Sequence, residues 1–139
     1  QRLDFAHKTA FTLVRDHDLI AHEALRIGNM TRSNRGTIES PGTNAAAKSG
    51  LNRSILDAGW GVFLNVLRAK AESAGRVVVE VDPRHTSQRC SQCGHIAAGN
   101  RVTQAQFRCL ACGYKSHADV NAARNILGAG LARQAAGAA

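Results

Sequence analysis

The sequence predicts an α/β fold that is interrupted by a four-cysteine zinc ribbon. Helical and strand patterns alternate over residues 1–84, in the order helix, strand, loop, helix, strand. Four cysteines follow in two close pairs, so the metal module is inserted after the last predicted strand.

The first helix and strand are predicted from apolar spacing. Over residues 3–15 apolar side chains recur with helical periodicity and charged residues lie between them. The apolar run 19–23 is too short for a helix and predicts a buried strand that ends in Glu23. A carboxylate at a strand end is usually a solvated loop residue, but strand ends are also where α/β sheets build their sites. Both readings of Glu23 remain open at this point.

Residues 29–50 are polar, rich in Gly, Ser, Thr and Asn, and lack periodicity, which predicts a mobile loop. The next helix has a broad apolar stripe from Leu51 to Ala71. Ser54-x-x-Asp57 resembles a capping box near its start, and Gly75 is placed to end it.

Two glycines complicate this helix. Gly59 and Gly61 each cost about 1 kcal/mol relative to Ala in a helix interior. Either close packing compensates, or the helix is kinked or divided there. Trp60 lies between them and is expected in the core. The β-branched run 77–81 that follows predicts a central strand rather than an edge strand.

The four cysteines form a C-x2-C…C-x2-C pattern, which is typical of a structural zinc site. The expected ligands are Cys90, Cys93, Cys109 and Cys112. Glycine follows the second cysteine of each pair, where the chain turns sharply. Two disulfides or a redox C-x-x-C are the competing interpretations. Nothing else indicates secretion, and the duplicated pair argues against a redox motif. A closed site of four thiolates holds structure and leaves no open position for catalysis.

The charge balance favours a polyanionic partner. Eighteen Lys and Arg against ten Asp and Glu give a formal charge of +8, so nucleic acid is expected first and an acidic membrane surface second. A basic protein without such a partner is the alternative. An aromatic content of 4% disfavours a base-stacking platform. The sequence contains no apolar run of membrane-spanning length and no secretory signal pattern, so we expect a cytoplasmic protein that associates with the nucleoid when bound to DNA.

The ribbon itself is basic. From residue 84 to residue 118 the sequence has no Asp or Glu. The expected phosphate contacts are Arg84, Arg89, Arg101, Arg108 and Lys115. Residues 102–108 alternate roughly enough to predict a hairpin strand that leads into the second cysteine pair.

A last helix is predicted over residues 116–128, with Ser116-x-x-Asp119 as its cap. Taken alone, Asp119 is a helix N-terminal charge that the dipole stabilises by about 0.3–1 kcal/mol. Residues 129–139 are rich in Ala and Gly, and we expect a disordered tail. Because the chain starts at Gln1 directly in a helical pattern, we expect a piece of a longer protein.

Several motifs together resemble the C-terminal part of the transposon-encoded TnpB/OrfB family. Those proteins are RNA-guided DNA nucleases related to compact type V CRISPR effectors. The resemblance rests on both cysteine pairs and on Asp18-Leu-Ile-Ala-His-Glu23, Leu51-Asn-Arg-Ser-Ile55 with Trp60, Gly75-Arg-Val-Val-Val79, Val81-Asp-Pro83, Thr86-Ser-Gln88 and Asp119-x-Asn-Ala-Ala-Arg-Asn-Ile126. Their order and spacing cover nearly the whole chain.

The resemblance implies a partial RNase H-like (RuvC) domain over residues 1–84, a nucleic-acid-binding zinc ribbon over 85–115 and the last RuvC-like helix over 116–128. In that family three acidic residues bind two Mg²⁺ ions. Glu23 matches the second position and Asp119 the third. The first acidic residue is expected before Gln1, together with most of the part that grips the guide RNA.

We therefore expect a parent protein that cuts DNA with Mg²⁺, and a chain that is inactive alone. Two departures from the family pattern are Ala24 after Glu23 and the pair Ser116-His117, where more charged residues are common. The alternative is a non-catalytic zinc-ribbon protein that binds nucleic acid and regulates transposition or transcription.

Overall fold

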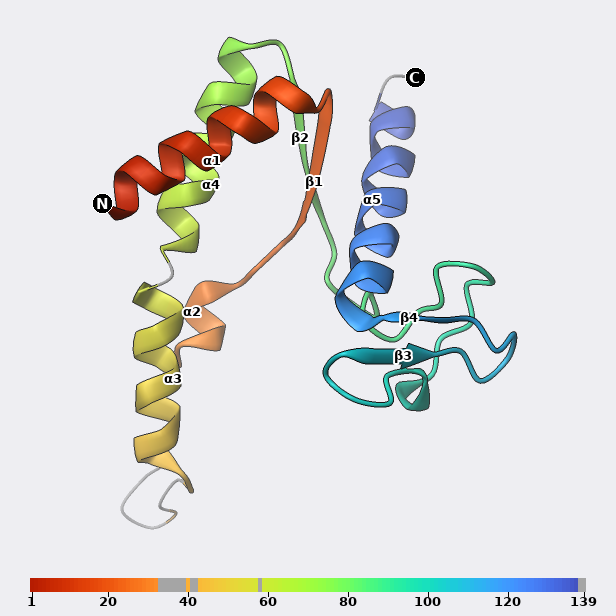
Figure 1. Ribbon diagram of the computed structural model, residues 1–139. Coiled ribbons are helices and arrows are strands. Elements are labelled where there is room, and N and C mark those ends of the chain that lie inside the picture. Colours follow the sequence, from red (N-terminus) through yellow and green to blue (C-terminus); the bar gives the residue numbers. More distant parts are fainter. Residues whose placement is uncertain (33–39, 41–42, 58, 138–139) are drawn as a thin grey trace. The chain divides into compact units, whose positions relative to one another are not determined.

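The computed structural model describes residues 1–32, 40, 43–57 and 59–137 (Figure 1). The chain divides into two compact units. The helical unit consists of residues 1–18 and 25–76, and the ribbon unit consists of residues 19–24 and 77–139.

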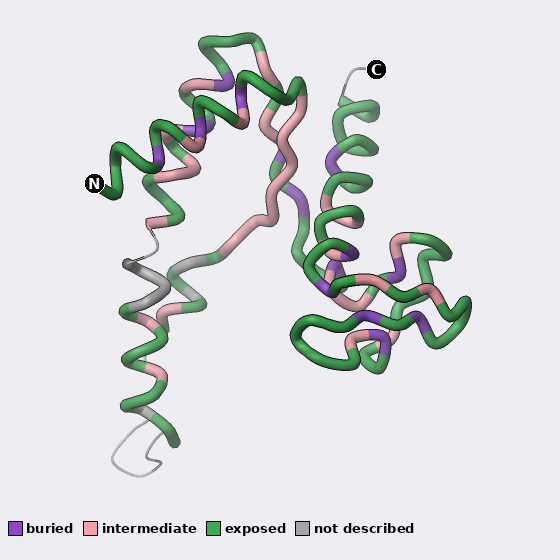
Figure 2. The backbone as a smooth tube through the Cα atoms, viewed as in Figure 1, coloured by how far each residue is buried: buried purple, intermediate pink, exposed green. Residues whose placement is uncertain are grey.

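The helical unit is built on the pairing of helix α1 (Arg2–Asp16) with helix α4 (Trp60–Ser73) (Figure 1). The buried residues of α1 are spaced four apart, and the buried residues of α4 are likewise four apart (Figure 2). They are Ala6, Ala10 and Val14 on α1 and Leu67 and Ala71 on α4. The predicted first helix is confirmed, and its alanines leave room for a close approach of the two helices.

The predicted loop over residues 29–50 is too long at both ends. Helix α2 (Ile27–Met30) ends inside that range, and helix α3 (Ala45–Asp57) begins inside it. Three consecutive alanines open α3, and alanine has the highest helix propensity. The Lys48 Nζ atom donates to the Met30 carbonyl at 2.5 Å, which ties the two helices together. The middle of the predicted loop, residues 33–39 and 41–42, lies outside the described residues.

The long predicted helix is divided, as its two glycines indicated. Gly59 has a φ of 66°, a left-handed conformation that ordinary residues avoid, and α4 starts after it. The capping-box prediction is wrong, because Ser54 and Asp57 lie near the end of α3 and not at its start. Trp60 is 45% exposed, so its expected core position is wrong too. As the first residue of α4 it stands at the end of the helix pair.

Gly75 ends α4 as predicted. It has a φ of 65°, and the Arg76 N–H donates to the Ala71 carbonyl at 2.8 Å. This bond closes a Schellman-type turn, which satisfies a carbonyl that the helix leaves free.

Both predicted strands of the ribbon unit are confirmed. Strand β1 (Leu19–Glu23) pairs in parallel with strand β2 (Val77–Val81), from Leu19 opposite Val77 to Glu23 opposite Val81. Helix α5 (Ala118–Gly137) packs against both strands (Figure 1). Within the described residues β2 has β1 as its one partner strand, so its expected central position in a sheet is not confirmed.

The predicted disordered tail is wrong, because α5 continues to Gly137. Gly130 is buried, and a Cβ atom added there would lie 2.7 Å from the Ala21 Cβ atom of β1. The Arg133 Nη1 atom donates to the Glu80 carbonyl of β2 at 2.6 Å. These contacts with the strands hold the second half of the helix in place.

The ribbon module contains a short 3₁₀ helix, η1 (Ala98–Asn100), and a small hairpin of β3 (Gln106–Arg108) and β4 (Lys115–His117). The predicted strand over 102–108 is thus shorter than expected. Ser116 lies in β4, so the predicted cap is wrong, and the His117 Nδ1 atom instead accepts from the Asp119 N–H at 3.3 Å. None of the described helices has both the length and the apolar character to cross a lipid bilayer.

Candidate metal centre and nucleic-acid surface

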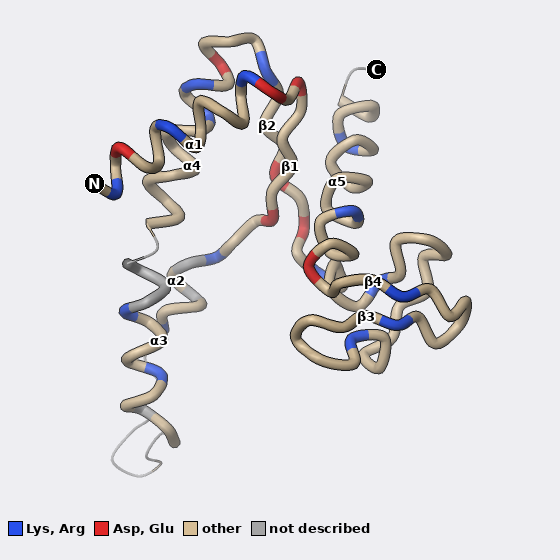
Figure 3. Tube along the Cα trace, viewed as in Figure 1, with Lys and Arg blue, Asp and Glu red and all other residues tan. Residues whose placement is uncertain are grey.

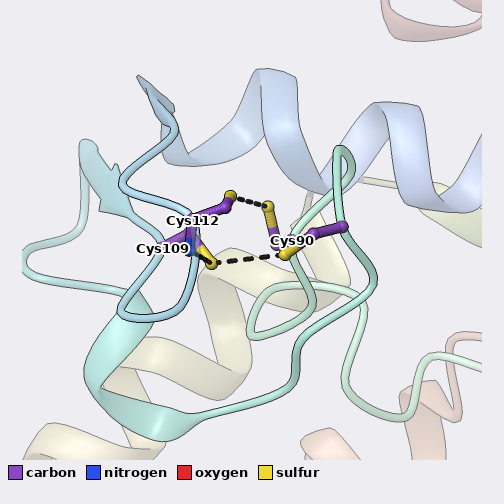
Figure 4. Close-up of side chains that lie close together, drawn as sticks. Cys90, Cys109 and Cys112 are labelled. Carbon is purple, nitrogen blue, oxygen red and sulfur yellow. Dashed lines mark hydrogen bonds between the residues drawn. The ribbon is translucent and has the colours of Figure 1, made fainter.

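The four predicted cysteine ligands come together in the ribbon module. Their sulfur atoms all lie within 4.8 Å of one another. The Cys90 and Cys112 sulfurs are 3.7 Å apart (Figure 4). The Cys93 and Cys109 sulfurs are 3.6 Å apart. Zn–S bonds of about 2.3 Å place the corners of a tetrahedron about 3.8 Å apart. The cluster therefore has the size that one Zn²⁺ ion requires.

The two cysteine pairs have the same backbone geometry. The Gly94 N–H donates to the Cys90 carbonyl at 2.9 Å, and the Gly113 N–H donates to the Cys109 carbonyl at 3.0 Å. The first cysteine of each pair also donates its N–H to the carbonyl five residues later, at 2.9 and 2.8 Å. Both glycines have positive φ angles, 77° and 74°, as their place in the motif predicted.

The sulfur atoms have unequal affinities for protons. The Cys112 backbone N–H lies 3.5 Å from the Cys109 sulfur and is the main reason why the pKa of Cys109 falls to about 6. The His95 backbone N–H lowers the pKa of Cys93, but hydrogen bonds with the other sulfurs and burial outweigh it and raise that pKa to about 12. A divalent metal that binds all four sulfurs would displace the protons that the cluster otherwise holds, because the thiolate is the metal-binding form of cysteine.

The disulfide alternative does not fit this geometry. All four cysteines are free. The sulfur distances of 3.6 and 3.7 Å are far longer than a disulfide bond of about 2.05 Å.

A buried amide joins the two cysteine pairs. The Asn100 Nδ2 atom donates to the Gln88 carbonyl at 2.9 Å and to the His95 carbonyl at 3.2 Å, on either side of the first pair. Its Oδ1 atom accepts from the Leu110 N–H at 2.9 Å, inside the second pair. Asn100 is completely buried, so these bonds are shielded from water.

Helix α5 holds the first cysteine pair with a second buried amide. The Asn121 Oδ1 atom accepts from the Ser91 N–H at 3.0 Å, and its Nδ2 atom donates to the Arg89 carbonyl at 2.8 Å. Asn121 thus bonds to the backbone on both sides of Cys90. From the sequence, Asn121 was only one position of the motif that starts at Asp119, and no partner was predicted for it. Its partners lie 30 and 32 residues away in sequence.

Asn125 lies one turn further along α5. Its Nδ2 atom donates to the Thr86 carbonyl at 2.9 Å and to the Arg89 carbonyl at 2.7 Å. The segment that leads from β2 to the first cysteine pair is therefore fixed by hydrogen bonds from α5.

The two predicted magnesium ligands both belong to the ribbon unit. Glu23 ends β1, and its Oε1 atom accepts from the Thr86 hydroxyl at 2.5 Å. Asp119 lies in the first turn of α5 with 78% of its side chain exposed, and its carboxylate is 3.8 Å from His117 Nδ1. Among the residues that the structure describes, three or more potential metal ligands lie close enough to share one ion only at the four cysteines. The sequence-based expectation did not pair Thr86 with Glu23.

The predicted phosphate contacts lie in two places. Arg108 on β3 is directly opposite Lys115 on β4. Arg84 and Arg89 line a hollow beside α5, together with Arg124. Figure 3 shows basic residues along the ribbon module, a stretch without acidic residues from 84 to 118.

The fifth predicted contact, Arg101, adjoins the hairpin. It forms an isolated bridge with Phe107, and its Nη2 atom donates to the Gln104 carbonyl at 3.1 Å.

Comparison with known proteins identifies relatives along the whole chain. A family model described as the Cas12f1-like TNB domain matches residues 60–126. InsQ of Escherichia coli (strain K12), named for an inferred RNA-guided DNA endonuclease activity, is 49% identical over 98% of this chain and 34% of its own length. The CRISPR-associated endodeoxyribonuclease Cas12f1 of Sulfoacidibacillus thermotolerans is 63% identical over 41% of this chain and 14% of its own length.

Solved structures share the fold at low sequence identity. The chain of a Cas12f1–sgRNA–target DNA complex matches 90% of this chain and 33% of its own length, with 22% identity and a TM-score of 0.57. CasPhi-2 (Cas12j) bound to crRNA matches 94% of this chain and 20% of its own length, with 22% identity and a TM-score of 0.59. The chain spans about a third or less of the length of these proteins and of the curated relatives above.

Proposed function

The chain belongs to the TnpB family and corresponds to its C-terminal part, and from this we propose that it serves a transposon-associated, RNA-guided DNA endonuclease. Its partners in this proposal are DNA and, mainly through other parts of the protein, a guide RNA. The observation that carries the proposal is a sulfur cluster of zinc size inside a segment that has five basic residues and no acidic one.

The proposed role of the ribbon is to hold DNA. Zn²⁺ on the four cysteines cross-links two short loops that bury little apolar surface of their own. The basic side chains around them then contact phosphate groups through charge-assisted hydrogen bonds. The proposed contacts are Arg84, Arg89, Arg101, Arg108 and Lys115.

The proposed catalytic contribution is two carboxylates of a RuvC-like site. Glu23 and Asp119 would hold Mg²⁺, which activates water and stabilises the leaving oxygen when two ions are bound. The Thr86 hydroxyl supports this role for Glu23, because it fixes one carboxylate oxygen and leaves the other available. The family's first acidic position has no match in this sequence, so the third carboxylate of the site must come from other residues.

A chimera tests the catalytic part. This chain replaces the segment of InsQ that it matches, and the chimera is purified with guide RNA and supplied with target DNA and Mg²⁺. We expect cleavage by the chimera, no cleavage by this chain alone, and one Zn²⁺ in each. Glu23→Gln or Asp119→Asn in the chimera is expected to lower cleavage at least 100-fold while DNA binding stays within about two-fold. Full cleavage by either variant would remove that residue from the metal site.

The second candidate function is a non-catalytic nucleic-acid-binding protein that regulates transposition or transcription. The observation behind it is the close group of four cysteines in a basic segment, because a zinc ribbon of this kind can bind nucleic acid without any carboxylate site. Zinc binding and DNA binding by this chain, with a chimera that binds its target but never cuts it, would establish this function instead.

A further inference from the structure

A basic hollow lies next to the first cysteine pair, on the ribbon unit. Its volume is about 490 Å³, and it is formed by the segment that follows β2 and by the middle of α5. Three arginines line it: Arg84 and Arg89 from that segment and Arg124 from α5. Gly94 and Gly128, which have no side chains, also line it and leave its interior open.

The three guanidinium groups differ in their partners. Arg84 Nε pairs with the Asp82 carboxylate at 3.1 Å. Arg124 Nη1 donates to the Tyr114 hydroxyl at 2.5 Å, which orients the side chain and leaves its charge uncompensated. In the described part of the chain, no hydrogen bond or ion pair involves the Arg89 side chain. The hollow therefore brings three guanidinium groups together beside one carboxylate, that of Asp82, and the sulfur of Cys90.

The main chain around the hollow is held before any ligand binds. The Arg89 carbonyl accepts hydrogen bonds from both Asn121 and Asn125, at 2.8 and 2.7 Å. Arg124 adjoins Asn125 on the same helix, so both sides of the hollow depend on the same contacts of α5. A site whose backbone is already fixed loses less conformational entropy on binding.

We propose that this hollow binds a backbone phosphate of a nucleic-acid strand, with Arg89 and Arg124 as its two ligands and Arg84 as an auxiliary one. The inference rests on the proposed function in taking nucleic acid as the partner, and it adds Arg124 and one defined site. Guanidinium groups present donors in a planar fork that matches phosphate oxygens. The volume lies in the range of small-molecule pockets, about 300–1,000 Å³, so the phosphate enters together with its sugar.

The test measures the affinity of the zinc-loaded chain for a fluorescent 20-nucleotide single-stranded DNA between 50 and 200 mM salt. Each phosphate contact contributes about 0.7 to the slope of log affinity against log salt for a single strand. We expect Arg89→Ala and Arg124→Ala each to lower the slope by about that amount. Lys8→Ala, which removes the same charge from the helical unit, is expected to leave the slope unchanged.

A second variant tests the site in the opposite direction. Asp82→Asn removes the carboxylate that pairs with Arg84 and that would repel a phosphate in the hollow. We expect it to tighten DNA binding about two- to five-fold at 50 mM salt, the factor that corresponds to an exposed ion pair. Zinc content and helical circular dichroism check the fold of every variant.

Three outcomes overturn the inference and separate it from the proposed function. If the wild-type chain binds DNA but neither arginine variant changes the salt slope, the hollow is not a phosphate site and the DNA-binding function stands. If a peptide nucleic acid of the same sequence, which has no phosphates, binds equally well, bases are recognised instead. If the wild-type chain does not bind DNA, the DNA-binding function fails, and the proposed site fails with it.

Discussion

At the scale of single residues, hydrogen bonds between positions far apart in sequence decide how the site is built. Asn100 and Asn121 are completely buried, and each bonds to the main chain next to a cysteine pair. Thr86 is 9% exposed and connects the segment before the first pair with Glu23. Buried polar groups of this kind stabilise one arrangement, because each lost partner leaves a desolvated donor or acceptor.

Thr86 offers a test of the bond to Glu23. Thr86→Val keeps the shape of the side chain and removes the hydroxyl, so we expect the free energy of unfolding to fall by about 1–3 kcal/mol. Thr86→Ser keeps the hydroxyl, so we expect it to lower the free energy of unfolding by less than Thr86→Val does. Urea denaturation of both variants measures the difference.

Because the hydroxyl also lies 3.0 Å from the Pro83 carbonyl, the effect of Thr86→Val alone does not isolate the bond to Glu23. A double-mutant cycle with Glu23→Ala, which removes the accepting oxygen, isolates it. Additive losses in that cycle would show that the pair does not interact.

At the scale of elements, the close approach of α5 to β1 depends on a missing side chain. Gly130→Ala would place a Cβ atom 2.7 Å from the Ala21 Cβ atom, so we expect it to lower the free energy of unfolding by about 1–3 kcal/mol. Gly128→Ala is the matched control on the same helix, because an added Cβ atom there meets nothing within 4 Å. Gly128→Ala is expected to raise the free energy of unfolding by up to about 1 kcal/mol, since alanine favours a helix. Thermal unfolding of both variants checks the pair, and equal effects would contradict the packing.

Elements with continuous local patterns were predictable from the sequence. α1 has a regular apolar period, and β1 and β2 are short apolar runs whose bounds the structure confirms. The second half of α5 could not be predicted, because its sequence is low in complexity and its support comes from β1 and β2. The start of α3 was missed for a related reason, since a few alanines next to a polar segment carry no periodicity.

Some residues of the candidate site were predictable from local sequence patterns, and others were not. The four cysteines were predictable because C-x2-C is a local pattern with a known metal geometry. Asn121, Asn125 and Thr86 were not assigned their roles, because their partners lie up to 63 residues away. Spacing along the chain therefore identifies metal ligands more readily than it identifies the residues that support them.

At the scale of the whole molecule, the two units have separate sources of stability. The ribbon module buries a small cluster of Cys90, Phe107, Cys109 and Ala118, in which two members are proposed metal ligands. The helical unit buries apolar residues of α1 and α4, and no cysteine lies in it. Metal should therefore matter to one unit far more than to the other.

Removal of zinc tests this division. A chelator, or the variant Cys93→Ser, is expected to unfold the ribbon module, because in small metal modules the energy of metal binding is energy of folding. The α1–α4 pair is expected to keep its amide protection in hydrogen-exchange measurements. If Cys93→Ser retains one Zn²⁺ and an unchanged thermal transition, the ligand assignment fails.

The parallel pairing of β1 with β2 also has a consequence for synthesis on the ribosome. Asp18 and Arg76 immediately precede the two strands, pair with each other and are 58 residues apart. At about 5–20 residues per second, β1 waits about 3–12 seconds for its partner to be translated. The two cysteine pairs, by contrast, close their turns within a few residues. The nascent chain thus carries an unpaired apolar strand for several seconds, and in that interval a chaperone that covers the strand would protect it.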